Sequence, residues 1–207
     1  MSNLKLYSHP LSGHAHRAEL LLSILGLDAE IITVDLMQGE QKQADFLKKN
    51  IFGQVPVLED GDITIADSNA ILVYLASQYD QQHKWLPLEP AKAAEVQRFL
   101  SVASGAVASG PATARLINLF GAKLDHEKAV ATAHHILGKI EEHLTNRQWL
   151  ATEHATIADL SNYAYIAHAP EGDVSLQDYP KVRAWIKRIE ELPGFIAMQT
   201  STVGLAA

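Results

Sequence analysis

The chain has 207 residues, of which 47% are hydrophobic and 20% are charged, a composition typical of a folded globular protein and not of a disordered one. Its net charge of -7, with Lys and Arg scattered along the chain, argues against nucleic acid as the main partner, because phosphate binding needs a clustered basic face. No apolar run reaches the length of a membrane span. The absence of cysteine excludes disulfides, zinc–thiolate sites and a cysteine nucleophile.

The first elements indicate a strand–helix–strand unit. Leu4–Tyr7 predicts a short strand that Pro10 ends, and an apolar stripe over Ala15–Leu25 predicts one face of a helix. Gly26 stands where a left-handed residue would end that helix, and Glu30–Val34 is a second β-rich run. This order predicts a βαβ unit whose two strands are parallel.

A hairpin and a capped helix follow. Val55–Glu59 and Ile63–Ala66 flank an Asp-Gly pair, which is a hairpin signal. Asp67 or Ser68 then caps an apolar helix. The first 80 or so residues therefore predict the order β-α-β-α-β-β-α, a small mixed sheet covered by helices.

The second half of the chain has a different pattern. Two prolines in Leu86–Pro90 make a stiff connector, after which long Ala- and Leu-rich segments predict helices only. These helices cover Ala91–Leu119, as one or two, then Glu127–Leu144 and Tyr179–Glu191, and a capping box at Thr156–Asp159 starts another. We expect an N-terminal domain over residues 1–80, a linker over 81–90 and an all-helical domain over 91–207.

Three motifs in this framework resemble the soluble glutathione transferases. Phe52–Gly61 is similar to the family's strand with a cis-proline, Asp67–Ile71 to the acidic-Ser pair that starts the third helix, and Thr156–Asp159 to the capping motif of the C-terminal domain. Pro10–Arg17 resembles the serine-type N-terminal motif of the phi and theta classes, and Gly39–Leu47 is phi-like in its pattern; the whole resembles a bacterial member of the family. The resemblance covers nearly the whole chain and implies a thioredoxin-like N-terminal domain followed by an all-α domain.

The resemblance gives a reason for Pro56, a proline at the start of an apolar strand. An X–Pro bond accepts the cis form far more readily than other peptide bonds. A cis bond between Val55 and Pro56 would leave the N–H and C=O of Val55 free, so that an extended peptide could pair with them like a further strand. The resemblance implies that Val55 meets the cysteinyl part of glutathione in this way. The alternative is an ordinary trans-proline at a strand start.

The start of the third helix is the second candidate binding position. Free backbone N–H groups and the helix dipole at Asp67-Ser68 suit a carboxylate, Ser68 adds a hydroxyl, and Asp67 suits the ammonium group of a γ-glutamyl moiety. Simple helix capping is the commoner reason for this pair. Gln41 and Lys42, with Gln54 nearby, are then candidates for the glycyl carboxylate, although a lone lysine is by default part of a solvated face.

Catalysis would require a thiolate, and Ser12 is the candidate that stabilises it. A free thiol with a pKa of about 8.5 is only a few per cent ionised at pH 7. Ser12 stands just ahead of the first helix, where the helix N-terminus and a donated hydroxyl proton would both act on the sulfur. Tyr7, at the end of the first strand, is the runner-up, as in tyrosine-type members of the family. His14 and His16 could also reach the sulfur, although polar surface histidines are the favoured interpretation, and Arg17 is expected as a structural residue or as part of the local positive field.

The electrophile is expected to bind between the domains, against the long helix of the second one. Small residues at helical spacing would leave room there, and Arg115 could meet an anionic substrate. Close packing of small residues against another helix explains each of them at least as well. The candidate pocket residues are Leu11, Ala103, Ala106, Val107, Gly110, Arg115 and Leu116.

The leading hypothesis is conjugation of glutathione thiolate to a small, hydrophobic electrophile, a detoxification chemistry. Alternatives are glutathione-dependent reduction of disulfides or peroxides, and a binding module that kept the fold and lost the chemistry. Glutathione is expected as co-substrate without a metal, because the ten histidines fit no zinc spacing. The resemblance implies a homodimer, and the lack of a signal-peptide pattern favours the cytoplasm.

Overall fold

The computed structural model describes residues 4–207 and begins with a sheet of mixed direction. The strand order is β2-β1-β3-β4, with β1 (Leu4–Ser8) parallel to β2 (Ala29–Thr33). The third strand, β3 (Val57–Asp60), is antiparallel to β1 and to β4 (Ile63–Ala66). The expected parallel pair and hairpin are therefore both present. Gly61 turns the hairpin with a φ of 58°, in the left-handed region that glycine adopts without strain.

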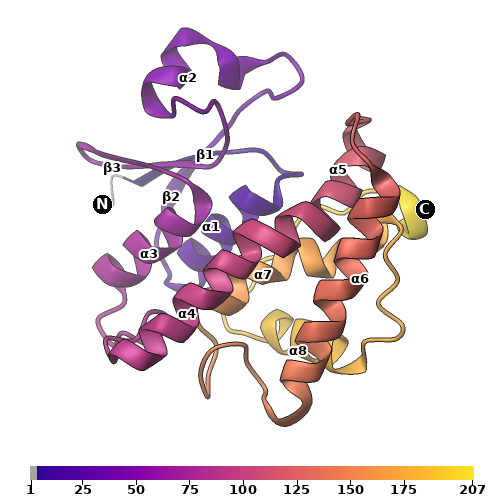
Figure 1. Cartoon of the computed structure of the whole chain (residues 1–207). Helices are drawn as coiled ribbons and strands as arrows, with labels where there is room; N and C mark the ends of the chain where they lie inside the picture. Colours follow the sequence, from indigo (N-terminus) through magenta and orange to yellow (C-terminus); the bar gives the residue numbers. More distant parts are fainter. Residues whose placement is uncertain (1–3) are drawn as a thin grey trace.

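Helices cover the two faces of this sheet (Figure 1). Two of them, α1 (Gly13–Ile24) and α3 (Ser68–Tyr79), lie on one face, and the short α2 (Ala44–Lys49) lies on the other. Because side chains alternate along a strand, neighbouring residues enter different cores. Leu6 and its partner Leu58 join the large core that continues into the helical domain. Tyr7 and Val57 instead contact the small core under α2.

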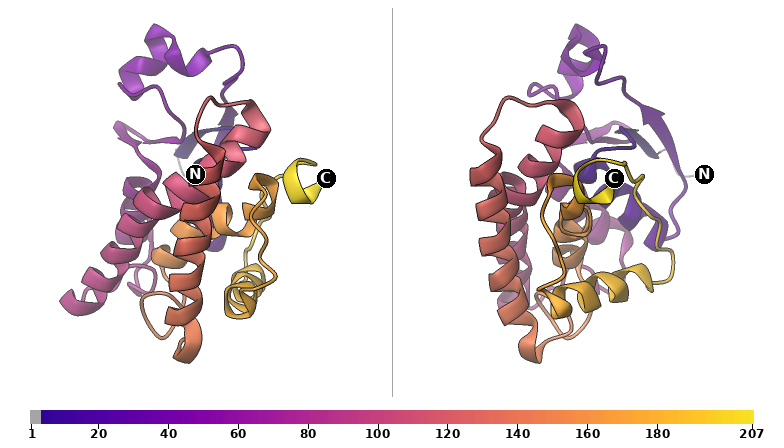
Figure 2. Two further views of the ribbon diagram at one scale, coloured as in Figure 1. Left: turned by 45° about the vertical axis from the view of Figure 1, so that its right-hand side comes forward. Right: turned by 90° about the vertical axis from the view of Figure 1, so that its right-hand side faces the viewer.

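The rest of the chain is helical, as the sequence predicts. A continuous helical path runs from α4 (Pro90–Val102) through a π-helical segment (Ala103–Ala112) into α5 (Thr113–Phe120). Figure 1 shows α6 beside that path, and Figure 2 shows the C-terminal segment returning to end near the turn that follows α7. The remaining helices are α6 (His126–His143), α7 (Ile157–Ala167) and α8 (Pro180–Glu190). No helix within residues 4–207 is long and apolar enough to cross a membrane.

The π-helical segment is the main departure from a regular helix. The backbone N–H of Thr113 bonds to the carbonyl of Ala108, five residues earlier, instead of four. Pro111 lies inside the segment; it has no N–H to donate, and its ring crowds the carbonyl four residues before it. A wider turn relieves this crowding. The segment therefore changes the angular position of every residue that follows it in α5.

The capping box predicted at the start of α7 is confirmed. Thr156 caps the helix and the backbone N–H of Thr156 donates to Asp159 Oδ2 at 2.9 Å. The other carboxylate oxygen, Oδ1, accepts from the N–H of Leu150 at 3.0 Å and from Nε1 of Trp185 at 2.9 Å. One buried carboxylate thus joins the start of α7, the loop before it and α8. This arrangement fixes α7 at the centre of the helical domain.

Candidate active site at the domain junction

A cleft of about 900 Å³ lies between the N-terminal unit and the helical domain. Loops that follow β1 and precede β3 form one side, and the end of the π-helical segment with α5 forms the other. Most residues that the sequence predicted for the site share this lining. They are Leu11, Ser12, Gln41, Lys42, Gln54, Val55, Pro56, Asp67, Ser68, Arg115 and Leu116.

Ser12 is the N-cap of α1 and opens on this cleft. Its backbone is extended, with φ -90° and ψ 110°, and its Oγ accepts from the N–H of Ala15 at 3.2 Å. Capping uses a lone pair of the hydroxyl and leaves its proton to be donated elsewhere. The first turn of α1 carries no acidic side chain that would neutralise the helix dipole. An anion in the cleft would therefore meet both the hydroxyl and the positive end of α1.

Tyr7, the runner-up to Ser12, does not line the cleft. Its hydroxyl donates to Glu59 Oε2 at 3.0 Å, and its ring packs edge-on against Phe46 at 6.1 Å between centroids. Lys49 Nζ lies 4.7 Å from the ring centre. Alternation along β1 turns this side chain to the α2 side of the sheet, whereas the chain reaches Ser12 only after a further loop.

The Val55–Pro56 peptide bond is cis, as the resemblance predicts. The ladder of β3 begins at Val57, two residues later than the sequence pattern suggested. Within residues 4–207, neither the N–H nor the C=O of Val55 has a hydrogen-bond partner, and Val55 lines the cleft. Its backbone is therefore available to an extended peptide.

Asp67 caps α3 from an uncommon backbone conformation, with φ 79° and ψ 127°. Its Oδ1 accepts from the N–H groups of Asn69 and Ala70, each at 2.9 Å. Its Oδ2 has no partner among the described residues and remains open to an external cation. Non-glycine residues with such φ values are rare and gather at ligand-binding positions, where the surrounding structure holds them.

The residues behind Ser68 were partly misjudged from sequence. Arg17 is structural, as expected: it is fully buried and donates to Ser68 Oγ at 3.3 Å and Asn69 Oδ1 at 3.0 Å. Of the two histidines expected at the surface, His16 is buried, and His14 is half-buried and lines the cleft. His16 is buried with Nε2 at 2.9 Å from the carbonyl of Ile196, and His14 Nδ1 lies 3.4 Å from Ser68 Oγ. Alternating His and Ala in this stretch gave no signal that both rings turn inward.

Both histidines are uncharged at neutral pH. Burial, assisted by the charge of Arg17, lowers the pKa of His14 to about 3. Burial lowers the pKa of His16 to about 4, against a smaller opposite effect of its hydrogen bond to Ile196. Burial also lowers the pKa of Arg17, to about 10, which still leaves it cationic. The positive field behind the cleft therefore comes from Arg17 and the helix N-termini.

Gln41, Lys42 and Gln54 meet at one end of the cleft because two loops touch there. Gly53 has a φ of 58°, and a Cβ added to it would lie 2.6 Å from the carbonyl oxygen of Gln41. Lys42 Nζ donates to the carbonyl of Phe52 at 3.0 Å. Gln41 Oε1 is buried without a partner among the described residues. Only glycine allows this close approach, which gathers polar groups at one point.

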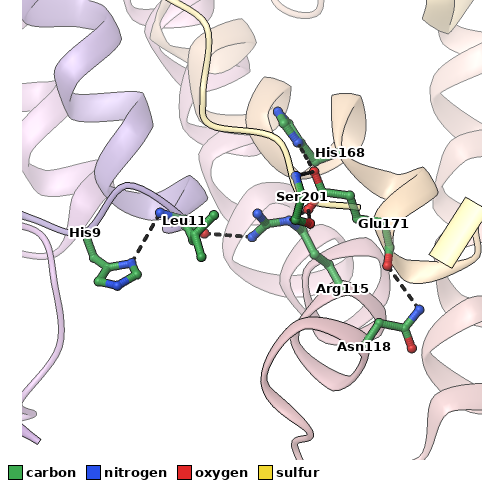
Figure 3. Close-up of polar contacts among 7 residues, drawn as sticks. All are labelled: His9, Leu11, Arg115, Asn118, His168, Glu171 and Ser201. Carbon is green, nitrogen blue, oxygen red and sulfur yellow. Dashed lines mark hydrogen bonds and ion pairs between the residues drawn. The ribbon is translucent and has the colours of Figure 1, made fainter. Parts of the chain in front are cut away.

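Arg115 holds the loop between β1 and α1 from the helical domain (Figure 3). Its Nη1 donates to the carbonyl of Leu11 at 2.7 Å, and its Nε pairs with Glu171 Oε2 at 2.7 Å. Glu171 is also bound by His168 Nδ1 at 2.6 Å and by the Ser201 hydroxyl at 2.6 Å. The guanidinium expected to meet an anionic substrate is thus largely engaged within the protein, while Arg115 lines the cleft.

The buried ion pair is electrostatically well supported. Both side chains of the Arg115–Glu171 pair are only 3% exposed. Burial acts to raise the pKa of Glu171, but the hydrogen bonds from His168 and Ser201 and the charge of Arg115 outweigh it and leave the pKa below its usual value. The carboxylate is therefore ionised at neutral pH, which keeps Arg115 and the Leu11 carbonyl in place. No sequence signal pointed to Glu171, His168 or Ser201.

The wall opposite the loops was only partly predicted from the helical spacing, which gave Arg115 and Leu116 correctly. Ala103, Ala106, Val107 and Gly110 do not line the cleft. A Cβ on Gly110 would lie 2.8 Å from the backbone nitrogen of Ala133, so this glycine serves close packing against α6. The residues of this helical path that line the cleft without having been predicted are Ala108, Ala112, Thr113 and Phe120. Within residues 4–207, no group of three or more His, Asp or Glu side chains is placed to hold a metal.

A thioredoxin-like unit with a cis-proline loop, joined to a helical domain across such a cleft, defines a class of glutathione-dependent enzymes. Residues 2–77 match the family model of the glutathione S-transferase N-terminal domain, and residues 82–193 match that of the C-terminal domain. The chain belongs to the glutathione S-transferase family, and it is a transferase.

Its relatives come from plants, insects and bacteria. It is 35% identical to glutathione S-transferase 3 of Zea mays, over 94% of this chain and 92% of the relative. Among solved structures, a glutathione S-transferase from Pseudomonas fluorescens has a TM-score of 0.89 at 32% identity, covering 95% of this chain and 99% of that one. A glutathione transferase homologue from Drosophila mojavensis, solved with bound glutathione, has a TM-score of 0.85 at 33% identity, covering 93% and 90%.

Proposed function

We propose that this protein binds glutathione in the cleft and transfers its thiolate sulfur to a small, apolar electrophile. The observation that carries the proposal is that Ser12, at the N-terminus of α1, opens on the same cleft as Val55 and the start of α3. One site thus offers a thiolate-stabilising group and backbone positions for a peptide. The bound glutathione in the Drosophila mojavensis homologue supports this assignment.

Each end of the ligand has a matching group in the cleft. The free Oδ2 of Asp67 suits the γ-glutamyl ammonium, and the N–H and hydroxyl of Ser68 at the start of α3 suit its carboxylate. The backbone of Val55 pairs with the cysteinyl part. Gln41, Lys42 and Gln54 lie where the glycyl carboxylate would end. Together these groups hold the tripeptide extended, with its sulfur toward Ser12.

The reaction itself requires a thiolate and an apolar neighbour. The hydroxyl of Ser12 and the dipole of α1 favour loss of the thiol proton to solvent, and the sulfur electron pair then forms a bond to carbon of the electrophile. Either a leaving group departs with its electrons or the charge moves to an acceptor that is then protonated by water. Leu11, Leu116 and Phe120 line the cleft on the electrophile side and favour an apolar substrate.

A titration of the bound thiol tests this function. The thiolate absorbance of bound glutathione is followed against pH in the wild type, in Ser12→Ala and in Ser109→Ala, whose hydroxyl bonds to its own exposed helix. We expect a thiol pKa about 2 units below the free value of about 8.5 in the wild type and in Ser109→Ala, and a rise in Ser12→Ala. A larger effect of Tyr7→Phe would transfer the role to Tyr7.

The same assay separates the competing functions. Glutathione that binds with an unshifted pKa would overturn the transferase mechanism, and no binding would favour a module without chemistry. A lowered pKa with oxidised glutathione as the product, formed from a peroxide, would favour reduction over conjugation.

Further proposals rest on family membership and on the sequence. They are a homodimer, a serine-type phi- or theta-like class, a cytoplasmic location, a role in detoxification, and domains over residues 1–80 and 91–207 joined by 81–90. A monomer observed by sedimentation at micromolar concentration would contradict the homodimer.

A further inference from the structure

His9 lies in the loop between β1 and α1 and lines the same cleft as Ser12. The backbone N–H of Ser12 donates to the carbonyl of His9 at 2.9 Å, which closes a turn over Pro10 and Leu11. The Cα atoms at the two ends of such a turn lie within about 7 Å of each other. The imidazole of His9 and the hydroxyl of Ser12 are therefore carried by the two ends of one turn beside the cleft.

The hydrogen bonds of this loop fix which nitrogen of the His9 ring carries the proton. The N–H of Leu11 donates to Nδ1 of His9 at 3.2 Å, so Nδ1 presents a lone pair. Burial lowers the pKa of His9, against a smaller opposite effect of Asp35, and the ring is therefore neutral at neutral pH. A neutral imidazole has a single N–H group, which must here be at Nε2.

The Nε2–H group of His9 is a free donor. Figure 3 shows the ring with one nitrogen bonded to Leu11 and the other turned away from it. Among residues 4–207 this second nitrogen has no hydrogen-bond partner, and it is not sealed from solvent, so a ligand in the cleft can reach it. The ring meets Phe120 of α5 edge-on, with 6.5 Å between centroids. The donor thus lies beside an apolar wall, where hydrogen bonds are stronger than in water.

Leu11, which orients the His9 ring, is itself held from the helical domain. Its carbonyl accepts from Arg115 Nη1 at 2.7 Å while its N–H binds His9, so both backbone polar groups of this residue are used (Figure 3). The ion pair of Arg115 with Glu171 behind it is only 3% exposed on either side. The imidazole is therefore fixed in advance, which is the condition for a donor that stabilises developing charge.

A neutral N–H group beside the thiolate suits an electrophile whose oxygen gains negative charge as the sulfur attacks. In an α,β-unsaturated ketone, the sulfur electron pair forms a bond to the β-carbon and the electrons of the carbon–carbon double bond move to give an enolate. Water then protonates the α-carbon and leaves hydroxide. Resting on the proposed function, we propose that His9 donates from Nε2 to the enolate oxygen and makes the cleft selective for unsaturated carbonyl electrophiles.

The test compares benzylideneacetone, an unsaturated ketone, with benzyl chloride, from which chloride departs and in which no oxygen gains charge. His9→Leu removes the donor, His9→Gln keeps an amide N–H near the position of Nε2, and His135→Leu removes an exposed histidine of α6 as the control. We expect His9→Leu to lower kcat/KM for benzylideneacetone at least about tenfold, and that for benzyl chloride less than about twofold. His9→Gln should restore part of the first value, and His135→Leu should change neither.

The thiol pKa of bound glutathione separates this proposal from the function on which it rests. His9→Leu should leave that pKa lowered, because Ser12 and the start of α1 are unchanged. An unshifted wild-type thiol pKa overturns the proposed function and the role of His9 with it. A lowered wild-type pKa with equal losses for both electrophiles in His9→Leu, or with no loss for either, leaves the function standing and overturns the role of His9. A thiol pKa that rises in His9→Leu would show an effect on Ser12 instead and would also overturn it.

Discussion

The starts of α1 and α7 use the same capping chemistry for opposite purposes. At α7, Thr156 and Asp159 cap each other's backbone and both are fully buried. At α1, Ser12 accepts from Ala15, but no acidic side chain in the first turn completes a box. The charge and donors at the start of α1 thus remain open to the cleft. A closed cap stabilises the fold, and an open cap leaves the helix N-terminus for an external anion.

The largest expected effect lies at the closed cap. Asp159→Ala removes the acceptor of four hydrogen bonds, from the N–H of Leu150, the N–H and hydroxyl of Thr156 and the indole of Trp185, and leaves these donors buried. We expect a loss of about 4 kcal/mol in the free energy of unfolding, measured with denaturant. The exposed Asp178→Ala is the control and should change little. A loss below about 1 kcal/mol would mean that the closed cap does not anchor α7.

The buried histidine behind the open cap predicts a pH dependence. In the unfolded chain His16 takes up a proton below its ordinary pKa of 6.5, whereas in the folded protein it stays neutral down to about 4. The unfolded state therefore binds more protons in this window, and stability falls as pH falls, by up to about tenfold in the folding equilibrium per pH unit.

His16→Gln should remove this contribution, since an amide can still bond to the Ile196 carbonyl and does not titrate. Stability curves between pH 4 and 6.5 for the wild type, His16→Gln and the exposed His135→Gln would test it. Identical slopes for all three proteins would contradict the assignment.

The smallest expected effect is the loss of folding stability when the capping hydroxyl of α1 is removed. Ser12→Ala loses one partly exposed capping bond and should reduce the free energy of unfolding by about 1 kcal/mol. The change in the thiol pKa should therefore be the dominant consequence of this substitution. A stability loss as large as that of Asp159→Ala would show that the two caps do not differ in purpose.

Local features of the site were predictable from the sequence, because caps and turns depend on neighbouring residues. Ser12, Asp67 and the Thr156 box follow from short-range patterns, and the cis-proline from the resemblance. Contacts between distant segments were not predictable. Arg115 and Glu171 are 56 positions apart, and Arg17 and Asn69 are 52 positions apart. The helical wall of the cleft was only partly predicted, because a regular 3.6-residue period was assumed where the helix is wider.

The wide turn of Ala103–Ala112 amounts to one inserted residue in an otherwise regular helix. A residue added to a regular helix rotates everything after it by about 100°, whereas a wider turn takes up the added residue locally and leaves the residues after it in place. Leu116 and Phe120 therefore keep their positions in the cleft, and Arg115 keeps the Leu11 carbonyl. The side chains that face the cleft are thus set by the winding of the backbone as much as by the order of residues in the sequence.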